Sequence, residues 1–86
     1  MSIQSIRNVC DMMARAIKHI EQEIKAEERR IQNLKKRLRQ LQSQPNPDLA
    51  KIQEIKTDIK ELEVQLEMDR SQLNAFQEEF AASCGP

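Results

Sequence analysis

A seven-residue repeat of apolar side chains, interrupted once, constrains this chain more than any other feature. With Ile3 as heptad position a, eleven of the twelve a and d positions in residues 3–41 are apolar, with Cys10 counted as a small hydrophobic residue. A second repeat, from Ile52 to Ser83, has eight apolar residues at ten such positions. This spacing places the apolar side chains on one stripe of a helix. The sequence therefore predicts two long amphipathic α-helices.

The interruption falls at residues 42–48, where two prolines stand close together. Pro45 and Pro47 cannot sit inside a helix, because each lacks an N–H and clashes with the preceding turn. We expect the first helix over residues 3–42, a turn at 43–47 and the second helix over 48–83. Asn46 is the expected cap of the second helix, with Pro47 in its first turn and Asp48 near its positive end.

A connection this short favours a hairpin, so residues 1–86 are expected to form a single all-α, antiparallel two-helix coiled coil. Charge supports the pairing: residues 1–44 hold ten bases and five acids, whereas residues 45–86 hold four bases and nine acids. The two halves therefore attract each other. The alternative is one long helix with a proline kink that dimerises in parallel.

The hairpin has one register in which the apolar positions face each other. If Leu41 faces Ile52, then facing core residues have numbers that sum to 93, and nearly all the layers are apolar on both sides. The same register predicts three flanking ion pairs. These pairs are Lys35 with Glu63, Arg37 with Asp58, and Glu28 with Arg70.

Two carboxylates interrupt the apolar core near its middle. Glu27 is predicted to face Leu66, and Asp69 to face Ile24, one layer away. We expect both side chains to bend outwards to water or to a nearby base, although polar core residues can also fix register and oligomeric state. A metal or proton site is the alternative, but no histidine lies nearby at matching spacing.

The sequence favours a non-enzymatic role. It has no Gly-rich phosphate loop, no nucleophile elbow and no paired cysteine motif. Its single histidine, His19, is predicted to lie on the solvent side, where it shares a face with Glu23. A two-helix rod also offers no concave substrate pocket. We therefore expect no catalytic residues, no cofactor, no metal and no small-molecule substrate.

Apolar residues outside the core stripe suggest a protein-binding surface. They widen the stripe where the two chain ends meet and form a smaller patch on the second helix. Exposed apolar rows of this kind bind other helices, and two hairpins could pair into a four-helix bundle as a homodimer. A locally thicker core is the alternative. The candidate interface residues are Val9, Met12, Met13, Ala16, Phe76, Phe80, Val64 and Met68.

A cluster of bases near the turn provides a second candidate surface. Residues 29–39 contain six bases and no acid: Arg29, Arg30, Lys35, Lys36, Arg37 and Arg39. One interpretation is that these bases pair with the acidic second helix. The alternative is that the chain is a basic-tipped hairpin whose bases contact nucleic acid or an anionic membrane. The zero net charge and the scarcity of aromatic side chains that could stack on bases weaken the nucleic-acid interpretation. A protein-binding adaptor or scaffold module is therefore the favoured function.

The two cysteines come close together in the same register. Cys10 is predicted to face residue 83, which places Cys84 within disulfide reach. No apolar run is long enough to span a bilayer, and the first twenty residues lack a signal-peptide core, so we expect an intracellular protein, cytoplasmic or nuclear. Thiols are usually reduced there. We therefore expect Cys10 and Cys84 to be reduced and to act as two small apolar residues at the end of the hairpin; a disulfide between them is the alternative.

Overall fold

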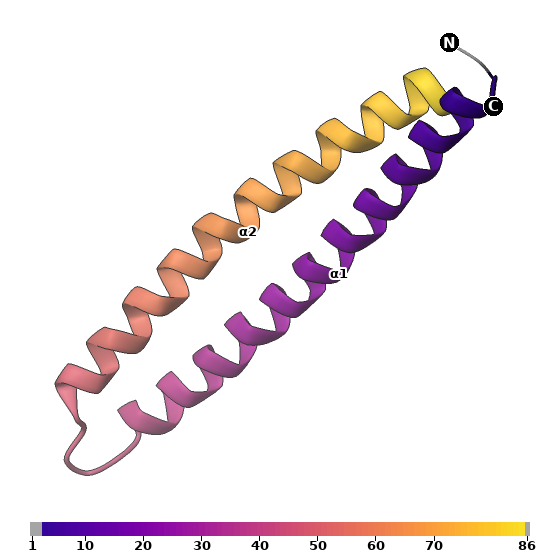
Figure 1. Ribbon diagram of the computed structural model, residues 1–86. Coiled ribbons are helices and arrows are strands. Elements are labelled where there is room, and N and C mark those ends of the chain that lie inside the picture. Colours follow the sequence, from indigo (N-terminus) through magenta and orange to yellow (C-terminus); the bar gives the residue numbers. More distant parts are fainter. Residues whose placement is uncertain (1–2, 86) are drawn as a thin grey trace.

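The chain folds into a hairpin of two long α-helices that run antiparallel (Figure 1). The computed structural model describes residues 3–85, in which α1 spans Ile3–Gln42 and α2 spans Leu49–Cys84. The hairpin measures 67 × 17 × 14 Å, which matches two straight helices of about 60 and 54 Å at ~1.5 Å per residue. The predicted all-α hairpin is confirmed, and the kinked single helix is excluded.

The core is the single apolar seam between the two helices. Its most buried side chains are isoleucines and one leucine at a and d positions: Ile20, Ile24, Ile31, Ile52, Ile55, Ile59 and Leu66. Leu34, Leu38, Leu41, Leu62, Leu73 and Phe76 pack against this cluster and are half-buried. No described side chain of the seam is completely buried, because two helices cannot surround a residue on all sides.

The seam loosens towards the end that carries the chain termini, which we call the open end. Met13, Ile17 and Phe80 are only half-buried, and Ile6 is 46 % exposed although it occupies a d position. The best-packed part of the hairpin therefore lies between its middle and the turn.

The cap of the second helix lies two residues later in the chain than the sequence predicted, and the helix begins at Leu49. Asp48 is the N-cap, with an extended backbone, and its Oδ1 accepts a hydrogen bond of 3.1 Å from the backbone N–H of Lys51. The expectation that Asn46 caps this helix was wrong. Asn and Asp are equally good caps, and the positive end of the helix additionally stabilises the negative charge of Asp48. Pro47 therefore precedes the helix.

The observed register agrees with the predicted one. Lys35 Nζ lies 3.8 Å from Glu63 Oε2, and this is the only ion pair between the helices among residues 3–85. Arg37 with Asp58, and Glu28 with Arg70, were predicted too, but neither pair is formed. At exposed positions the attraction between such charges barely exceeds the entropy of fixing two long side chains.

Candidate functional site

The hairpin has two flat sides that differ in chemistry. In an antiparallel pair the two e positions flank one side of the seam and the two g positions flank the other. Lys35 and Glu63, which form the ion pair, are both e residues. We call the opposite side, made of the g and c positions of both helices, the g side.

Methionines and small residues follow the g side towards the open end. On α1 they are the exposed Val9 and Met12 and the half-buried Ala16 and Ala26, and on α2 they are the exposed Met68, Ala75 and Ala82. Met12 is 67 % exposed and Met68 59 % exposed, which is unusual for large apolar side chains. Between its middle and the open end, the g side is thus an apolar surface that carries only two carboxylates, Glu23 and Glu79, whereas charged residues predominate on it nearer the turn.

The structure brings most of the predicted interface residues together, but one lies apart. Met13, Phe76 and Phe80 are half-buried in the seam beneath the open end of the g side. Met68 shares the g side with Met12 but lies about 20 Å closer to the turn. Val64 is an f residue, 57 % exposed, so it lies outside the g side on α2. It is nevertheless one turn from Met68, and both side chains line the same hollow.

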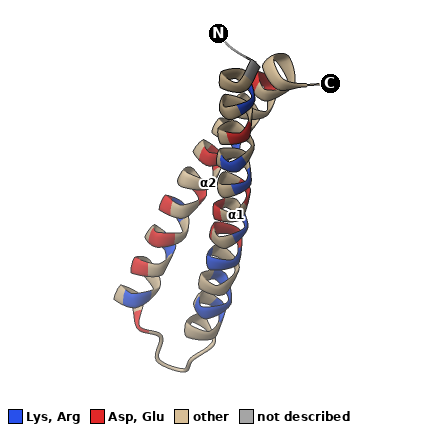
Figure 2. Ribbon diagram, turned by 45° about the vertical axis from the view of Figure 1, so that its right-hand side comes forward, with Lys and Arg blue, Asp and Glu red and all other residues tan. Residues whose placement is uncertain are grey.

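The predicted basic cluster does not form one patch. Lys35 lies on the e side with Glu63, whereas Arg30 and Arg37 lie on the g side. The other three bases, Arg29, Lys36 and Arg39, lie on the outer face of α1. Bases predominate on the turn half of α1 and acids on α2 (Figure 2).

The outer face of α1 carries further bases that the sequence analysis did not single out. Arg15, Lys18 and Lys25 occupy the same b and f positions as Arg29, Lys36 and Arg39, and all six are exposed. A search for consecutive bases missed the first three because they are spread along the chain. Sorting the bases by heptad position would have found them.

The two core carboxylates do not bend outwards, so that expectation was wrong. Asp69 is only 8 % exposed and its Oδ1 accepts a 3.0 Å hydrogen bond from Gln65 Nε2, one turn earlier in α2. Glu27 is half-buried, and its Oε1 is buried without a hydrogen-bond partner. The short side chain of Asp69 lies at a d position inside the seam, and no base among residues 3–85 forms an ion pair with it.

The environment of Glu27 favours its neutral form. Burial contributes most, followed by hydrogen bonding to Asp69 and by the negative charges of Asp69 and Glu23. Together they raise the pKa of Glu27 from 4.5 to about 7, although Arg30 acts in the opposite direction. A neutral Glu27 can donate a hydrogen bond to the neighbouring carboxylate of Asp69. Glu27 can therefore bind and release a proton near neutral pH.

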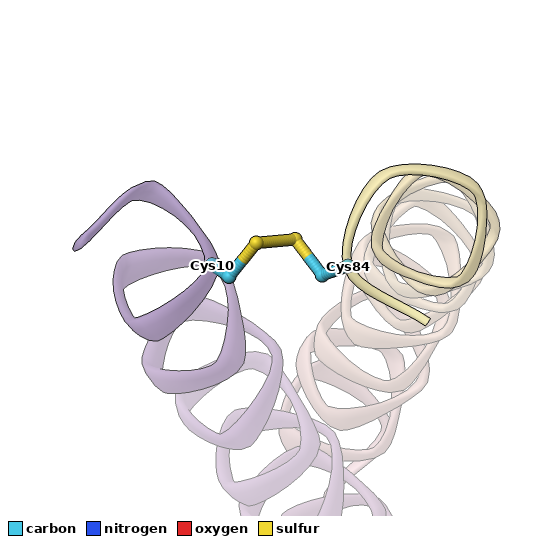
Figure 3. Close-up of a disulfide and its surroundings, with 2 residues drawn as sticks. All are labelled: Cys10 and Cys84. Atoms are coloured by element: carbon cyan, nitrogen blue, oxygen red, sulfur yellow. A yellow bond between two sulfur atoms is a disulfide. The ribbon is translucent and has the colours of Figure 1, made fainter. Parts of the chain in front are cut away.

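Cys10 and Cys84 form a disulfide that closes the open end (Figure 3). Their Cα atoms lie 5.7 Å apart, within the usual range for a disulfide. The structure thus contains the disulfide, not the two thiols that we expected from the sequence. The bond links α1 to the last residue of α2 across 74 positions of the chain.

Metal-binding chemistry gains no support from the described part of the chain. Residues 3–85 contain no group of three or more His, Cys, Asp or Glu side chains that could hold a metal ion. His19 Nε2 forms an exposed pair with Glu23 Oε1 at 3.0 Å, as the i, i+4 spacing predicted. Neither described helix is long and apolar enough to cross a membrane.

Comparisons with known proteins assign no relative to this chain: no family model, no curated protein and no solved structure matches it. Its function must therefore be inferred from its surfaces.

Proposed function

We propose that the hairpin is a non-enzymatic protein-interaction module that binds a second copy of itself through the g side, forming a four-helix bundle. The observation that carries the proposal is the row of exposed apolar side chains on this side, with Met12 and Met68 as its largest members. A two-helix hairpin buries a single seam and gains little stability from it. Pairing through the g side would bury a second apolar surface.

Charge favours one arrangement of the two hairpins. The segment 3–42 carries ten bases and five acids, whereas the segment 49–84 carries four bases and eight acids. A dimer that packs α1 on α1 would place the two basic helices together. A two-fold axis along the length of the hairpin instead packs α1 of each copy on α2 of the other, so that every helix lies beside helices of opposite charge and opposite direction.

The same arrangement matches large side chains with small ones. Facing positions keep the same level along the rod, so Met12 of one copy would meet Ala82 of the other, and Met68 would meet Ala26. A long flexible side chain opposite an alanine is the pattern by which helices interlock. Nearer the turn, Arg30 would lie opposite Glu61 of the second copy. We therefore propose a parallel dimer with both open ends at the same end of the bundle.

The experiment is light scattering of the intact, oxidised protein, with one interface variant and one matched control. We expect a mass of twice 10.1 kDa for the wild type, even in high salt, because apolar contacts are not screened. Met68→Asp should give monomers, whereas Leu49→Asp should leave the dimer intact. Both replace a large exposed apolar side chain of α2, 59 and 75 % exposed, but Leu49 is an e residue on the opposite side of the hairpin.

Two results would contradict the proposal. A monomeric wild type at high protein concentration would mean that the g side awaits a different protein. Dissociation by Leu49→Asp but not by Met68→Asp would move the interface to the e side.

A further inference from the structure

The outer face of α1 carries charges but no apolar seam. Its basic residues alternate with amides at b and f positions, and no acid occupies any b, c or f position between residues 12 and 40. We call the six bases the outer track: Arg15, Lys18, Lys25, Arg29, Lys36 and Arg39. Because a helix partner needs an apolar stripe to pack against, this face is unsuited to a coiled-coil contact.

The charges of the outer track are not neutralised within the molecule. None of its six bases forms an ion pair with any of the described residues; the two ion pairs there involve His19 and Lys35. The acids nearest to it are Asp11, at a b position one turn before Arg15, and Glu21 and Glu28, at e positions beside the track. Most other acids lie on α2, beyond a helix separation of about 8–10 Å. That distance is close to the screening length in physiological salt, so the track presents a net positive field despite the neutral chain.

The bases of the outer track come in three pairs with regular spacing. The pairs are Arg15 with Lys18, Lys25 with Arg29, and Lys36 with Arg39. Their midpoints are separated by between ten and eleven residues, which is about 16 Å along a helix. A line parallel to the axis of duplex DNA meets two phosphate backbones in each turn of about 34–36 Å, one every ~17 Å on average. Long lysine and arginine side chains can absorb the unequal widths of the two grooves.

We infer that the outer track binds the phosphate backbones of duplex nucleic acid, with one basic pair at each of three successive backbone crossings. The intervening amides of Gln22, Gln32 and Asn33 can donate further hydrogen bonds to phosphate oxygens. The face carries no aromatic residue to stack on bases, so binding is independent of sequence and needs no single strand. An anionic membrane is disfavoured, since the track has no apolar side chain to insert between lipids.

This function goes beyond the proposed dimer and is compatible with it. The g side and the outer face of α1 are different surfaces, so pairing through the g side leaves one outer track exposed on each copy. A loss of nucleic-acid binding without a change in mass therefore separates the two proposals.

The test is fluorescence anisotropy of a labelled 20-bp duplex of arbitrary sequence with the full chain over a series of salt concentrations. Four to six phosphate contacts predict a slope of about −4 to −5 in log affinity against log salt, or a loss of several hundred-fold between 50 and 200 mM. The track variant changes five track bases, all except Arg15 beside Asp11, to glutamine. The control variant does the same at five bases that lie outside both the track and the g side, Arg7, Lys35, Lys56, Lys60 and Arg70, so both variants lose five positive charges.

We expect the track variant to lose at least about 100-fold in affinity relative to the control variant, while both remain helical and keep the wild-type mass. Equal losses in the two variants would overturn the inference, because net charge alone would then explain binding. So would a wild type that fails to bind at 50 mM salt, or a salt slope near zero. Vesicles of equal parts phosphatidylserine and phosphatidylcholine form the comparison arm. Binding to these vesicles but not to the duplex would assign the track to a membrane surface and likewise overturn it.

Discussion

Glu27 of α1 lies beside the buried Asp69 of α2, so two carboxyl groups from different helices share the apolar seam. Such a pair is stable only if one member carries a proton, because two adjacent negative charges in a poorly hydrated site repel each other. The pair therefore links the stability of the hairpin to pH.

We expect the hairpin to become less stable as pH rises from about 4.5 to 7. The pKa of Glu27 is about 7 in the folded chain and 4.5 as its ordinary value, so the folded state binds more protons over this range and the free energy of unfolding falls. The partial exposure of Glu27 limits the loss to on the order of 1–2 kcal/mol. Urea unfolding at pH 5 and pH 8 measures it. Glu27→Gln should abolish this part of the pH dependence, and an unchanged difference would show that other groups cause it.

Replacing Glu27 by leucine should stabilise the hairpin. The substitution removes a buried oxygen without a hydrogen-bond partner and places an apolar side chain opposite Leu66. We expect a higher melting temperature together with a broader distribution of oligomers, because polar core residues restrict partner geometry. Circular dichroism and light scattering report the two effects. A large drop in melting temperature would mean that Glu27 has a stabilising partner in the dimer.

The ion pair between Lys35 and Glu63 should show measurable coupling. Lys35→Glu and Glu63→Lys should each destabilise slightly, and the double reversal should recover about 0.2–1 kcal/mol at low salt. Chemical denaturation of the four proteins completes the cycle. The same cycle for Glu28 and Arg70, which form no ion pair, should give a smaller coupling. The reverse order would mean that the observed pairing does not persist in solution.

Loss of the disulfide should destabilise the hairpin more than any single surface change. A crosslink between positions 74 apart restricts the unfolded chain strongly, and removing it typically costs about 2–4 kcal/mol. We expect Cys10→Ala/Cys84→Ala and the reduced wild type to unfold at similarly lower urea concentrations. Reductant should have no effect on the double variant. Equal stability of oxidised and reduced wild type would rule out a stabilising role.

The cap of α2 is tested by comparing two neighbouring positions. Asp48→Ala removes the acceptor of the Lys51 N–H and should lower the free energy of unfolding by about 0.5–2 kcal/mol. Asn46→Ala should have almost no effect, because Asn46 lies outside the helix. Thermal unfolding distinguishes the two. A larger effect of Asn46→Ala would mean that Asn46, as predicted from the sequence, caps the helix in solution.

The heptad pattern was sufficient to predict the helices, the turn and the register. Apolar residues such as Ile24 and Ile59 can be assigned to the seam because burial follows the periodicity, and the numbers of facing residues then follow from the turn. The Lys35–Glu63 pair agrees with that register. These features depend on spacing along the chain, which the sequence records directly.

The errors arose where neighbouring groups compete. Asn46 and Asp48 are both good caps, and spacing does not decide which side chain reaches a free N–H. The rotamer of Asp69 and its hydrogen bond with Gln65 likewise depend on local packing. The six bases of the outer track were visible in the sequence, but they form one surface only after each residue has been assigned to a helix face.

The position of the disulfide determines how the hairpin would respond to a pulling force. Tension applied to the two chain ends passes through the bond between Cys10 and Cys84, so the helices between them bear no load. After reduction the same tension would separate the helices progressively from the open end, releasing roughly 250 Å of chain at about 3.4 Å per residue. Single-molecule stretching with and without reductant would reveal whether this thiol pair turns a short rigid linker into a long extensible one.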